Sequence, residues 1–177
     1  YLKAACQNSK SKFRGITLRY FNTFGPFQTG AFVIPKFINN LKENKNLIIN
    51  GSGNQTRSYC YVEDTAKGTV LALKFLLENK TRYENFNIGN PNNLISLKNL
   101  AKKIFDLNSS VKSKSKIIFD KKFTKTDRSS NREINNRVCN ISKAKKLLRF
   151  EPKISLDKGL KKTIVSNSII SDWPNEN

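Results

Sequence analysis

The sequence predicts an α/β protein, because two kinds of hydrophobic periodicity alternate along it. One is the short apolar run of a buried strand, as in GITLRYF, residues 15–21. The other is the stripe of an amphipathic helix, as in TAKGTVLALKFLLENK, where Leu71, Phe75 and Leu76 are spaced to face a core. With 177 residues and 37% hydrophobic content, the chain is long enough for one folded domain with a core of its own.

The other elements follow from the same patterns. We expect, in chain order, the end of a helix within 1–12, a helix over 31–44 with Pro35 in its first turn, strands over 47–50, 58–62 and 84–89, a helix over 97–107, a strand over 117–120, helices over 142–150 and 155–170, and a tail at 171–177. Four side chains stand where helix N-caps are expected, namely Asp64, Ser96, Ser142 and Ser155. The glycines of GSGN, Gly51 and Gly53, predict a hairpin turn.

The composition is strongly basic, with a formal net charge of +20. The lysines are spread over helix faces and loops together with many asparagines, rather than gathered in an arginine-rich stripe. A coding bias towards Lys, Asn and Ile codons gives the same composition, although a nucleic-acid-binding module stays open as an alternative. No apolar run approaches the roughly 20 residues that span a bilayer, and the first residues lack the apolar centre of a secretory signal. We therefore expect a cytoplasmic protein with no membrane partner.

The cysteine and histidine counts argue against a metal centre. Cys6, Cys60 and Cys139 lie far apart and form no C-x-x-C pair, and the sequence has no histidine. A zinc site takes about four nitrogen or sulfur ligands, so we expect no metal and three reduced, buried thiols. The absence of histidine also removes the Ser-His and Cys-His nucleophile pairs.

Two features could bind an anion. Asn22 follows the strand at 15–21, and the carboxyl ends of sheet strands are where α/β proteins bind ligands, although the same residue equally suits a turn. Arg57 opens an apolar alternation, and its planar guanidinium suits phosphate oxygens. Arg132 and Arg137, taken one at a time, are better explained as surface charges. Together with Arg57 they could form an anion clamp, but the sequence alone does not bring the three together.

Four segments together resemble the second half of the extended short-chain dehydrogenase/reductase family, the NAD-dependent nucleotide-sugar epimerases, dehydratases and decarboxylases. They are LRYFNTFGP, LIINGSGNQTRSYCYVEDTAKG, FNIGNP and NRVCNISKAKKLLRFEPKISLDKGL, and the match runs from near Tyr1 to about Ile164. The resemblance implies the tail end of a Rossmann-type parallel sheet, to which 1–28 and about 59–90 contribute. A small α/β nucleotide-sugar-binding part would comprise 29–58 and 91–170.

The resemblance also assigns roles to single residues. It places Tyr20 and Phe21 beside the nicotinamide of NAD, Asn22, Arg57 and the neighbouring Tyr59 at the sugar diphosphate, Val33, Ile34 and Pro35 around the nucleotide base, and Arg137 on the nucleotide or on a substrate carboxylate. Asn140 stands where the family often has Asp, at a position linked to a ribose hydroxyl. Arg149 stands where a glycine is usual, which costs about 1 kcal/mol if the backbone there needs a positive φ.

The remaining family machinery has no counterpart in the sequence. The glycine-rich dinucleotide loop, the catalytic Ser/Thr and the Tyr-x-x-x-Lys pair would precede Tyr1, and the sequence has no methionine, so we expect it to begin within a longer chain. The resemblance then implies a nucleotide-sugar-binding portion for a UDP- or dTDP-sugar that contains no catalytic residue itself. NAD would be bound mainly by the preceding part, and the parent would be a homodimer. A non-catalytic nucleotide-sugar binder is the alternative.

Overall fold

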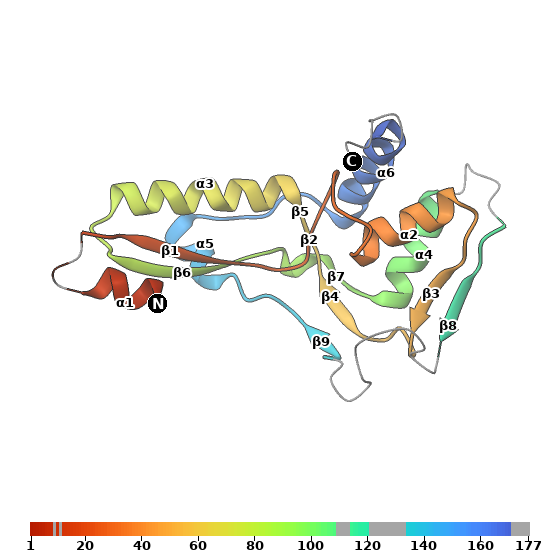
Figure 1. The fold of residues 1–177 in the computed structure, drawn as a ribbon, viewed down its shortest axis with the longest axis horizontal. Helices are drawn as coiled ribbons and strands as arrows, with labels where there is room; N and C mark the ends of the chain where they lie inside the picture. Colours follow the sequence, from red (N-terminus) through yellow and green to blue (C-terminus); the bar gives the residue numbers. More distant parts are fainter. Residues whose placement is uncertain (9, 11, 109–113, 121–133, 171–177) are drawn as a thin grey trace.

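The computed structural model describes the chain except for residues 9, 11, 109–113, 121–133 and 171–177, with side chains described up to residue 166. The predicted α/β class is confirmed, in an elongated arrangement with a hydrophobic core toward each end (Figure 1).

One end is built on a parallel strand pair, β1 (Gly15–Tyr20) and β6 (Tyr83–Ile88). Helix α3 (Val62–Glu78) connects the two strands in the way that parallel pairing requires and lies on one face, while α1 (Leu2–Gln7) lies on the other (Figure 1). Helix α5 (Ser142–Leu148) packs against β6 and α3. The buried residues at this end form what we call the small core: Ala72, Phe86, Ile88, Ala144, Leu148 and Phe150.

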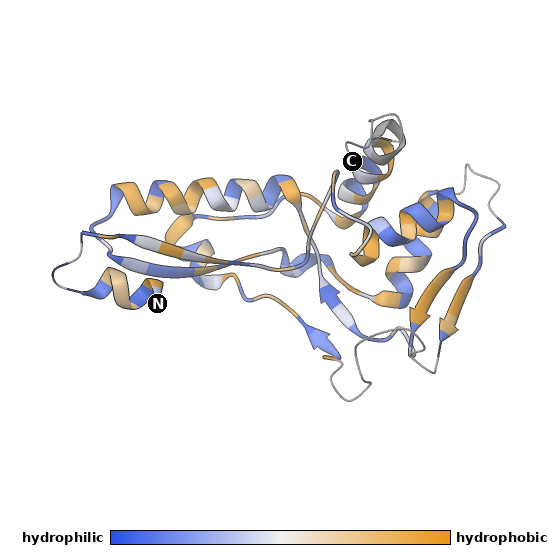
Figure 2. Ribbon diagram, viewed as in Figure 1, coloured by the Kyte–Doolittle hydropathy of each residue, from blue (hydrophilic) through white to orange (hydrophobic). Residues whose placement is uncertain are grey.

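The other end packs two amphipathic helices, α2 (Val33–Lys42) and α4 (Leu97–Leu107), against β3 (Leu47–Asn50), which pairs in parallel with β8 (Ile117–Asp120). Ser96 caps α4 as predicted, because its Oγ accepts a hydrogen bond from the Asn99 N–H. The large core comprises Phe24, Ile34, Phe37, Ile38, Leu41, Leu47, Ile49, Tyr59, Tyr61, Leu100, Ala101, Ile104, Leu156 and Leu160. Figure 2 shows the hydrophobic residues of β3 and β8 at this end.

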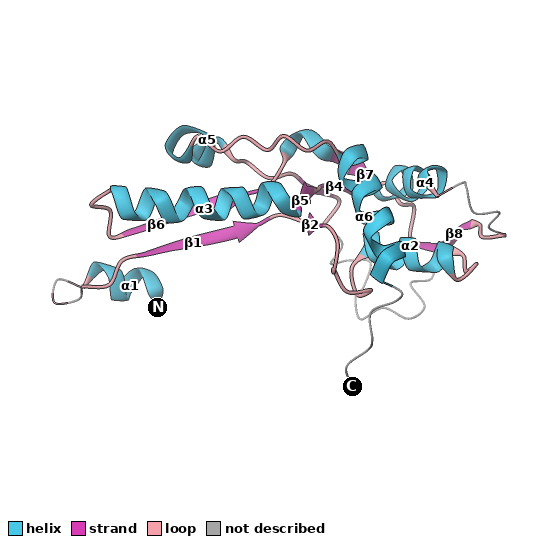
Figure 3. Ribbon diagram, turned by 90° about the horizontal axis from the view of Figure 1, so that it is seen from above, coloured by secondary structure: helices cyan, strands magenta, loops and turns pink. Residues whose placement is uncertain are grey.

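Short strands join the two ends. Strand β2 (Thr23–Phe24) pairs in parallel with β5 (Cys60–Tyr61), and β4 (Thr56–Ser58) lies between β7 (Leu94–Ser96) and β9 (Asn136–Arg137). The 3-10 turn η1 (Pro91–Asn93) precedes β7, and α6 (Leu156–Ile170) contacts β5. Seen from above, α6 lies between the end of α3 and helix α2 (Figure 3). The chain therefore crosses between its two ends several times, and each crossing is only a few residues long.

The predicted hairpin at GSGN is wrong. Strand β3 pairs with β8 and β4 pairs with β7 and β9, so the turn connects two different sheets. Gly51 and Gly53 adopt φ of 74° and 70°, a left-handed conformation that glycine takes without strain. The Gly53 carbonyl accepts a hydrogen bond from the Lys98 N–H at the start of α4, which holds the turn against that helix.

The strand predicted over 58–62 is also divided. It breaks at Tyr59, whose N–H donates to the Asn93 carbonyl, while the next N–H, of Cys60, donates to Asn22 on the other side. Alternating side chains along the segment predicted one strand, but the backbone changes its pairing partner after Ser58. This change carries the chain from the β4 sheet to the β2–β5 pair.

Two of the predicted caps are wrong. Helix α3 begins at Val62, so Asp64 lies inside its first turn and accepts backbone N–H bonds from Lys153 and Ile154 instead. Helix α5 has Ile141 as its N-cap residue, and Ser142 is its first helical residue. Ser155 does act as predicted, because its Oγ accepts from the Lys158 N–H.

The outer face of α3 carries an apolar stripe. Val62, Val70, Leu73 and Leu77, spaced by three, four or eight residues, are between 37% and 71% exposed. Helical periodicity places them along one side of the helix, opposite the buried Gly68 and Ala72. Among the described residues, these four side chains leave apolar surface exposed to water along α3.

Candidate functional site

A cavity of about 1300 Å³ lies where the two ends meet. Its walls come from the end of β1 and the segment that follows, from the first turn of α2, and from β3, β4 and β9. The lining residues are Tyr20, Asn22, Thr23, Phe24, Gly25, Pro26, Phe27, Gln28, Ala31, Phe32, Val33, Ile34, Lys36, Phe37, Ile48, Asn50, Gln55, Arg57, Tyr59, Val62, Leu97, Ile134 and Arg137. Three of them are cationic and none is acidic, so the cavity suits an anionic ligand.

Arg57 and Arg137 come together because β4 and β9 run in parallel with these two residues as direct partners. Neighbouring residues of paired strands project to the same face, so both guanidinium groups line one wall of the cavity. The Arg57 Nη1 donates to the carbonyls of Thr56 at 2.8 Å and Asn135 at 3.5 Å. The described residues of this wall include no carboxylate. Two adjacent guanidinium groups can donate several hydrogen bonds to an anion that has several oxygens.

Asn22 is held at the carboxyl end of β1 by a left-handed backbone with φ of 39°, a conformation that Asn tolerates better than most residues. Its Nδ2 donates to the Ser58 carbonyl at 3.0 Å, and its own carbonyl accepts the Cys60 N–H. These bonds fix the side chain next to β4. Asn22 and Arg57 are therefore positioned by the same pair of backbone segments.

Two tyrosines contribute in different ways. Tyr20 is 51% exposed, and its hydroxyl shares a 2.9 Å hydrogen bond with Thr69 on α3, which holds its ring at the cavity wall. Tyr59 is buried and packs edge-on against Phe24. Burial raises the pKa of Tyr59 to about 12 even though Arg57 opposes the shift, so its hydroxyl is neutral at physiological pH.

The first turn of α2 forms another wall. Val33 and Ile34 line the cavity, and the N-cap residue Phe32 makes no side-chain capping bond. Pro35 lies in that turn as predicted, but it is buried on the core side and does not line the cavity.

Two further predicted residues lie outside the cavity. Phe21 donates its N–H to the Ile88 carbonyl. The Asn140 Oδ1 accepts the Ser142 N–H at 2.9 Å, so this side chain caps the first turn of α5. Arg132 lies outside the described residues.

Sequence reasoning missed several lining residues, among them Asn50 and Gln55. Asn50 ends a strand just as Asn22 follows one, so the same rule about carboxyl ends of parallel strands would have found it. Phe27, Phe32 and Lys36 had no such signal, because loop aromatics and helix lysines are common on any surface.

The three cysteines are free and buried, as predicted. Within the described part of the chain, no group of three or more His, Cys, Asp or Glu side chains could hold a metal ion. In that same part, no helix has the length and apolar character needed to cross a bilayer.

Comparison with known proteins gives a consistent result. The model of the NAD dependent epimerase/dehydratase family matches residues 1–89. The UDP-glucuronate 4-epimerase of Thermodesulfobacterium geofontis is 33% identical over 160 residues, which cover 90% of this chain and 43% of that enzyme. The human dTDP-D-glucose 4,6-dehydratase is also 33% identical, over 168 residues that cover 94% of this chain and 43% of the enzyme.

A solved structure agrees with these relatives. The UDP-glucuronic acid 4-epimerase of Bacillus cereus, in complex with UDP-glucuronic acid and NAD, has a TM-score of 0.69 and 32% identity, over 88% of this chain and 45% of that one. The chain thus spans less than half the length of each of these three proteins.

Proposed function

Because the chain belongs to the NAD-dependent epimerase/dehydratase family, a group of extended short-chain dehydrogenases/reductases, we propose that it forms the nucleotide-sugar-binding portion of such an enzyme. The substrate would be a UDP- or dTDP-sugar, and the reaction a 4-epimerisation, a 4,6-dehydration or a decarboxylation. Residues 1–28 and about 59–90 would belong to the Rossmann-type sheet, and 29–58 and 91–170 to the substrate-binding part.

One observation carries this proposal: Arg57 and Arg137 are direct partners on parallel strands, and the described residues that line the cavity beside them include no acidic side chain. A nucleotide diphosphate brings two negative charges and several oxygens to such a wall. We assign the diphosphate to Arg57, Arg137 and Asn22, with the neutral Tyr59 hydroxyl as a further hydrogen-bond donor. Asn22 has a second amide hydrogen beyond the one donated to Ser58.

The nucleotide base would lie at the wall formed by Val33 and Ile34, next to Ile48. Apolar side chains there give the flat base a dry surface. Pro35 would shape this wall from behind through its fixed φ. The proposed contacts do not include Asn140, because its Oδ1 already accepts the Ser142 N–H.

NAD, when bound, accepts a hydride from a carbon of the sugar. The half-exposed Tyr20 ring, anchored through Thr69, offers a flat surface at the cavity wall that fits a nicotinamide ring, whereas Phe21 would act only through packing. Most of the cofactor-binding surface would belong to the part of the relatives that this chain does not span.

The test is titration of the chain with UDP by calorimetry. We expect Arg57→Ala and Arg137→Ala each to weaken binding by about 10- to 100-fold, the equivalent of one lost charge-assisted contact. Arg57→Lys should lie in between, because it keeps the charge and loses the planar fork. Lys146→Ala on α5 removes an equal charge outside the cavity and should leave the affinity unchanged.

The same titration separates this proposal from a nucleic-acid module. Affinity for a mixed-sequence oligonucleotide that exceeds the affinity for UDP, falls steeply with salt and is indifferent to Arg57→Ala would contradict the proposal.

A further inference from the structure

The loop between β2 and α2 presents an exposed aromatic residue in a strained backbone conformation. Phe27 has a φ of 65° and its side chain is 80% exposed. A bulky residue with a left-handed backbone is an outlier, because its Cβ crowds the following carbonyl. Such strain persists only where the surrounding structure imposes it.

The surrounding turn does impose it. A Cβ at Gly25 would lie 2.5 Å from the Val62 Cγ1, so the chain passes too close to α3 for any other residue there. Pro26 fixes its own φ, and the Gln28 Nε2 donates to the Thr23 carbonyl at 2.9 Å, which closes the turn on the far side of Phe27. The turn is rigid on both flanks, and it holds the Phe27 ring out from the protein.

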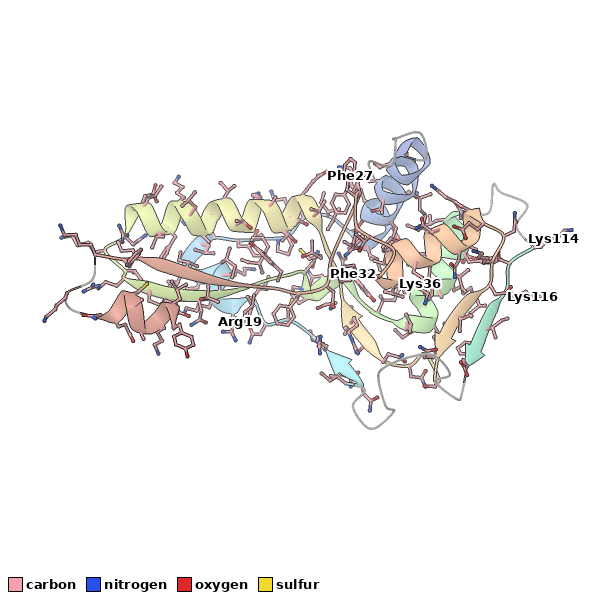
Figure 4. The ribbon with its side chains drawn as sticks, viewed as in Figure 1. Arg19, Phe27, Phe32, Lys36, Lys114 and Lys116 are labelled. Atoms are coloured by element: carbon pink, nitrogen blue, oxygen red, sulfur yellow. The ribbon has the colours of Figure 1, made fainter. Side chains whose placement is uncertain are left out.

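Phe27 also lines the cavity. Figure 4 shows it in the β2–α2 loop beside α6, whereas Phe32 and Lys36 lie apart from it at the start of α2. The residues that line the cavity fall into two sets. One set lies on the side of β1, β2 and α3 and comprises Tyr20, Thr23, Phe27 and Val62. The other set lies on the side of α2 and β3 and includes Val33 and Ile48. Arg57 and Arg137 come from the β4–β9 pair and belong to neither set.

We propose that Phe27 is a specificity-determining residue whose ring forms a platform for the hexose of the bound nucleotide sugar. This inference rests on the proposed function, because it takes the diphosphate to lie at the two arginines and the base to lie at α2 and β3. The sugar beyond the diphosphate then reaches the β1–β2 side. The C–H groups on one face of a hexose carry a small positive polarisation, and the face of an aromatic ring is negative, so the two attract while water is excluded.

The proposal also explains the exposure and the strain together. A ring whose partner is a ligand is exposed when the cavity is empty, and a rigid turn avoids the entropy of ordering the ring when the ligand binds. An exposed ring on a left-handed backbone adds little stability, because it buries little apolar surface and strains the chain.

The test compares UDP with UDP-glucose as ligands of each variant, because UDP-glucose adds the hexose to the same nucleoside diphosphate. The readout is the change in the ratio of the two affinities between variants, since UDP carries an additional phosphate charge that affects every variant alike. For Phe27→Ala we expect unchanged affinity for UDP and an affinity for UDP-glucose about fivefold lower. Phe27→Tyr keeps the aromatic face and should bind both ligands as the parent chain does. Phe119→Ala removes a half-exposed phenylalanine from β8, outside the cavity, and is the matched control.

The variant Phe27→Gly distinguishes the effect of the aromatic ring from the effect of the backbone strain. Glycine adopts the positive φ without strain, so we expect its melting temperature to rise by about 2–4 °C while the preference for UDP-glucose is lost. A lower melting temperature would assign the ring a structural role and overturn the proposal.

The remaining outcomes are distinct. An unchanged ratio of the two affinities in Phe27→Ala, or an equal loss for UDP and UDP-glucose, would remove the hexose platform while the proposed function stands. Failure of the parent chain to bind UDP at all would remove the proposed function, and the platform with it.

Discussion

The two cores use similar residue types but differ in how completely their elements enclose them. Among the described residues, the large core has fourteen buried residues between α2, α4, α6, β3 and the short strands, whereas the small core has six between one strand pair, α3 and α5. A two-stranded parallel sheet with few helices around it buries little apolar area, and α3 accordingly leaves Val70, Leu73 and Leu77 in contact with water.

Because the two cores differ, the elements that line much of the cavity are not the elements that are least enclosed. Much of the cavity wall comes from elements of the large core, among them α2, β3 and the start of α4. The β1 end contributes Tyr20 and Asn22 from a less enclosed support. We therefore expect the two ends of the molecule to differ in local stability.

The largest effect should come from emptying one core at a time. Phe37 and Phe86 are both 1% exposed, one in each core. We expect Phe37→Ala to lower the free energy of unfolding by about 3–5 kcal/mol and to loosen the whole chain. Phe86→Ala removes a similar volume but should expose β1 and β6 to amide hydrogen exchange while α4 stays protected. Uniform loss of protection in both variants would mean that the two cores unfold as one unit.

The next largest effect should come from Asp64, which links the two cores. It is buried in α3, and its carboxylate accepts the N–H groups of Lys153 and Ile154, just before α6. We expect Asp64→Asn to cost about 3 kcal/mol, because one amide hydrogen would then face a backbone N–H. Urea unfolding measures the loss. Glu63→Gln, which breaks an exposed ion pair with Lys162, is the control and should cost under about 0.5 kcal/mol.

Alkaline pH should act on the large core. Burial raises the pKa of Tyr59 from 10.0 to about 12. The unfolded chain loses this proton near pH 10 and the folded chain only near pH 12, so the stability that depends on Tyr59 is unchanged below pH 10 and falls by about 2 kcal/mol towards pH 12. Burial also raises the pKa of Cys60, from 9.0 to about 11. Deprotonation of Cys60 therefore starts the loss of stability about one pH unit below the loss that depends on Tyr59. Tyr59→Phe should remove the later part of the fall in urea titrations over this range, and an unchanged profile would contradict the assignment.

The smallest effect is a gain. Arg149 ends α5 with a φ of 53°, between Leu148 and Phe150 of the small core. Arg149→Gly should stabilise the chain by about 1 kcal/mol, because glycine adopts this conformation without strain. Thermal melting would show the gain, and Arg149→Ala, which keeps the Cβ, should show none.

The sequence predicted the elements better than their pairing. Regular patterns such as the stripe of α4 and the apolar run of β1 predicted helices and strands that the structure confirms. The errors fall where the chain changes partners, at the Gly51–Gly53 turn and at Tyr59, because a local pattern does not contain the identity of the strand beside it. Asp64 was misassigned for the same reason: its partners, Lys153 and Ile154, are about 90 residues away.

The candidate site shows the same limit. The family resemblance indicated Asn22, Arg57 and Arg137, and the structure brings all three to one cavity, although their roles stay predictions. The resemblance included no role for Phe27. Its significance lies in a backbone angle and an exposed ring, and neither is encoded in a motif.

The pairing of Arg57 with Arg137 has a consequence for the order of events in folding. The two residues are 80 positions apart, and the contact between Asp64 and Lys153 spans 89. Closing loops of this length costs chain entropy before the contacts repay it, so such contacts form slowly and late, after local helices such as α3 and α4. The wall formed by Arg57 and Arg137 would then assemble late, so the proximity of these two side chains would report the last step of folding rather than the first.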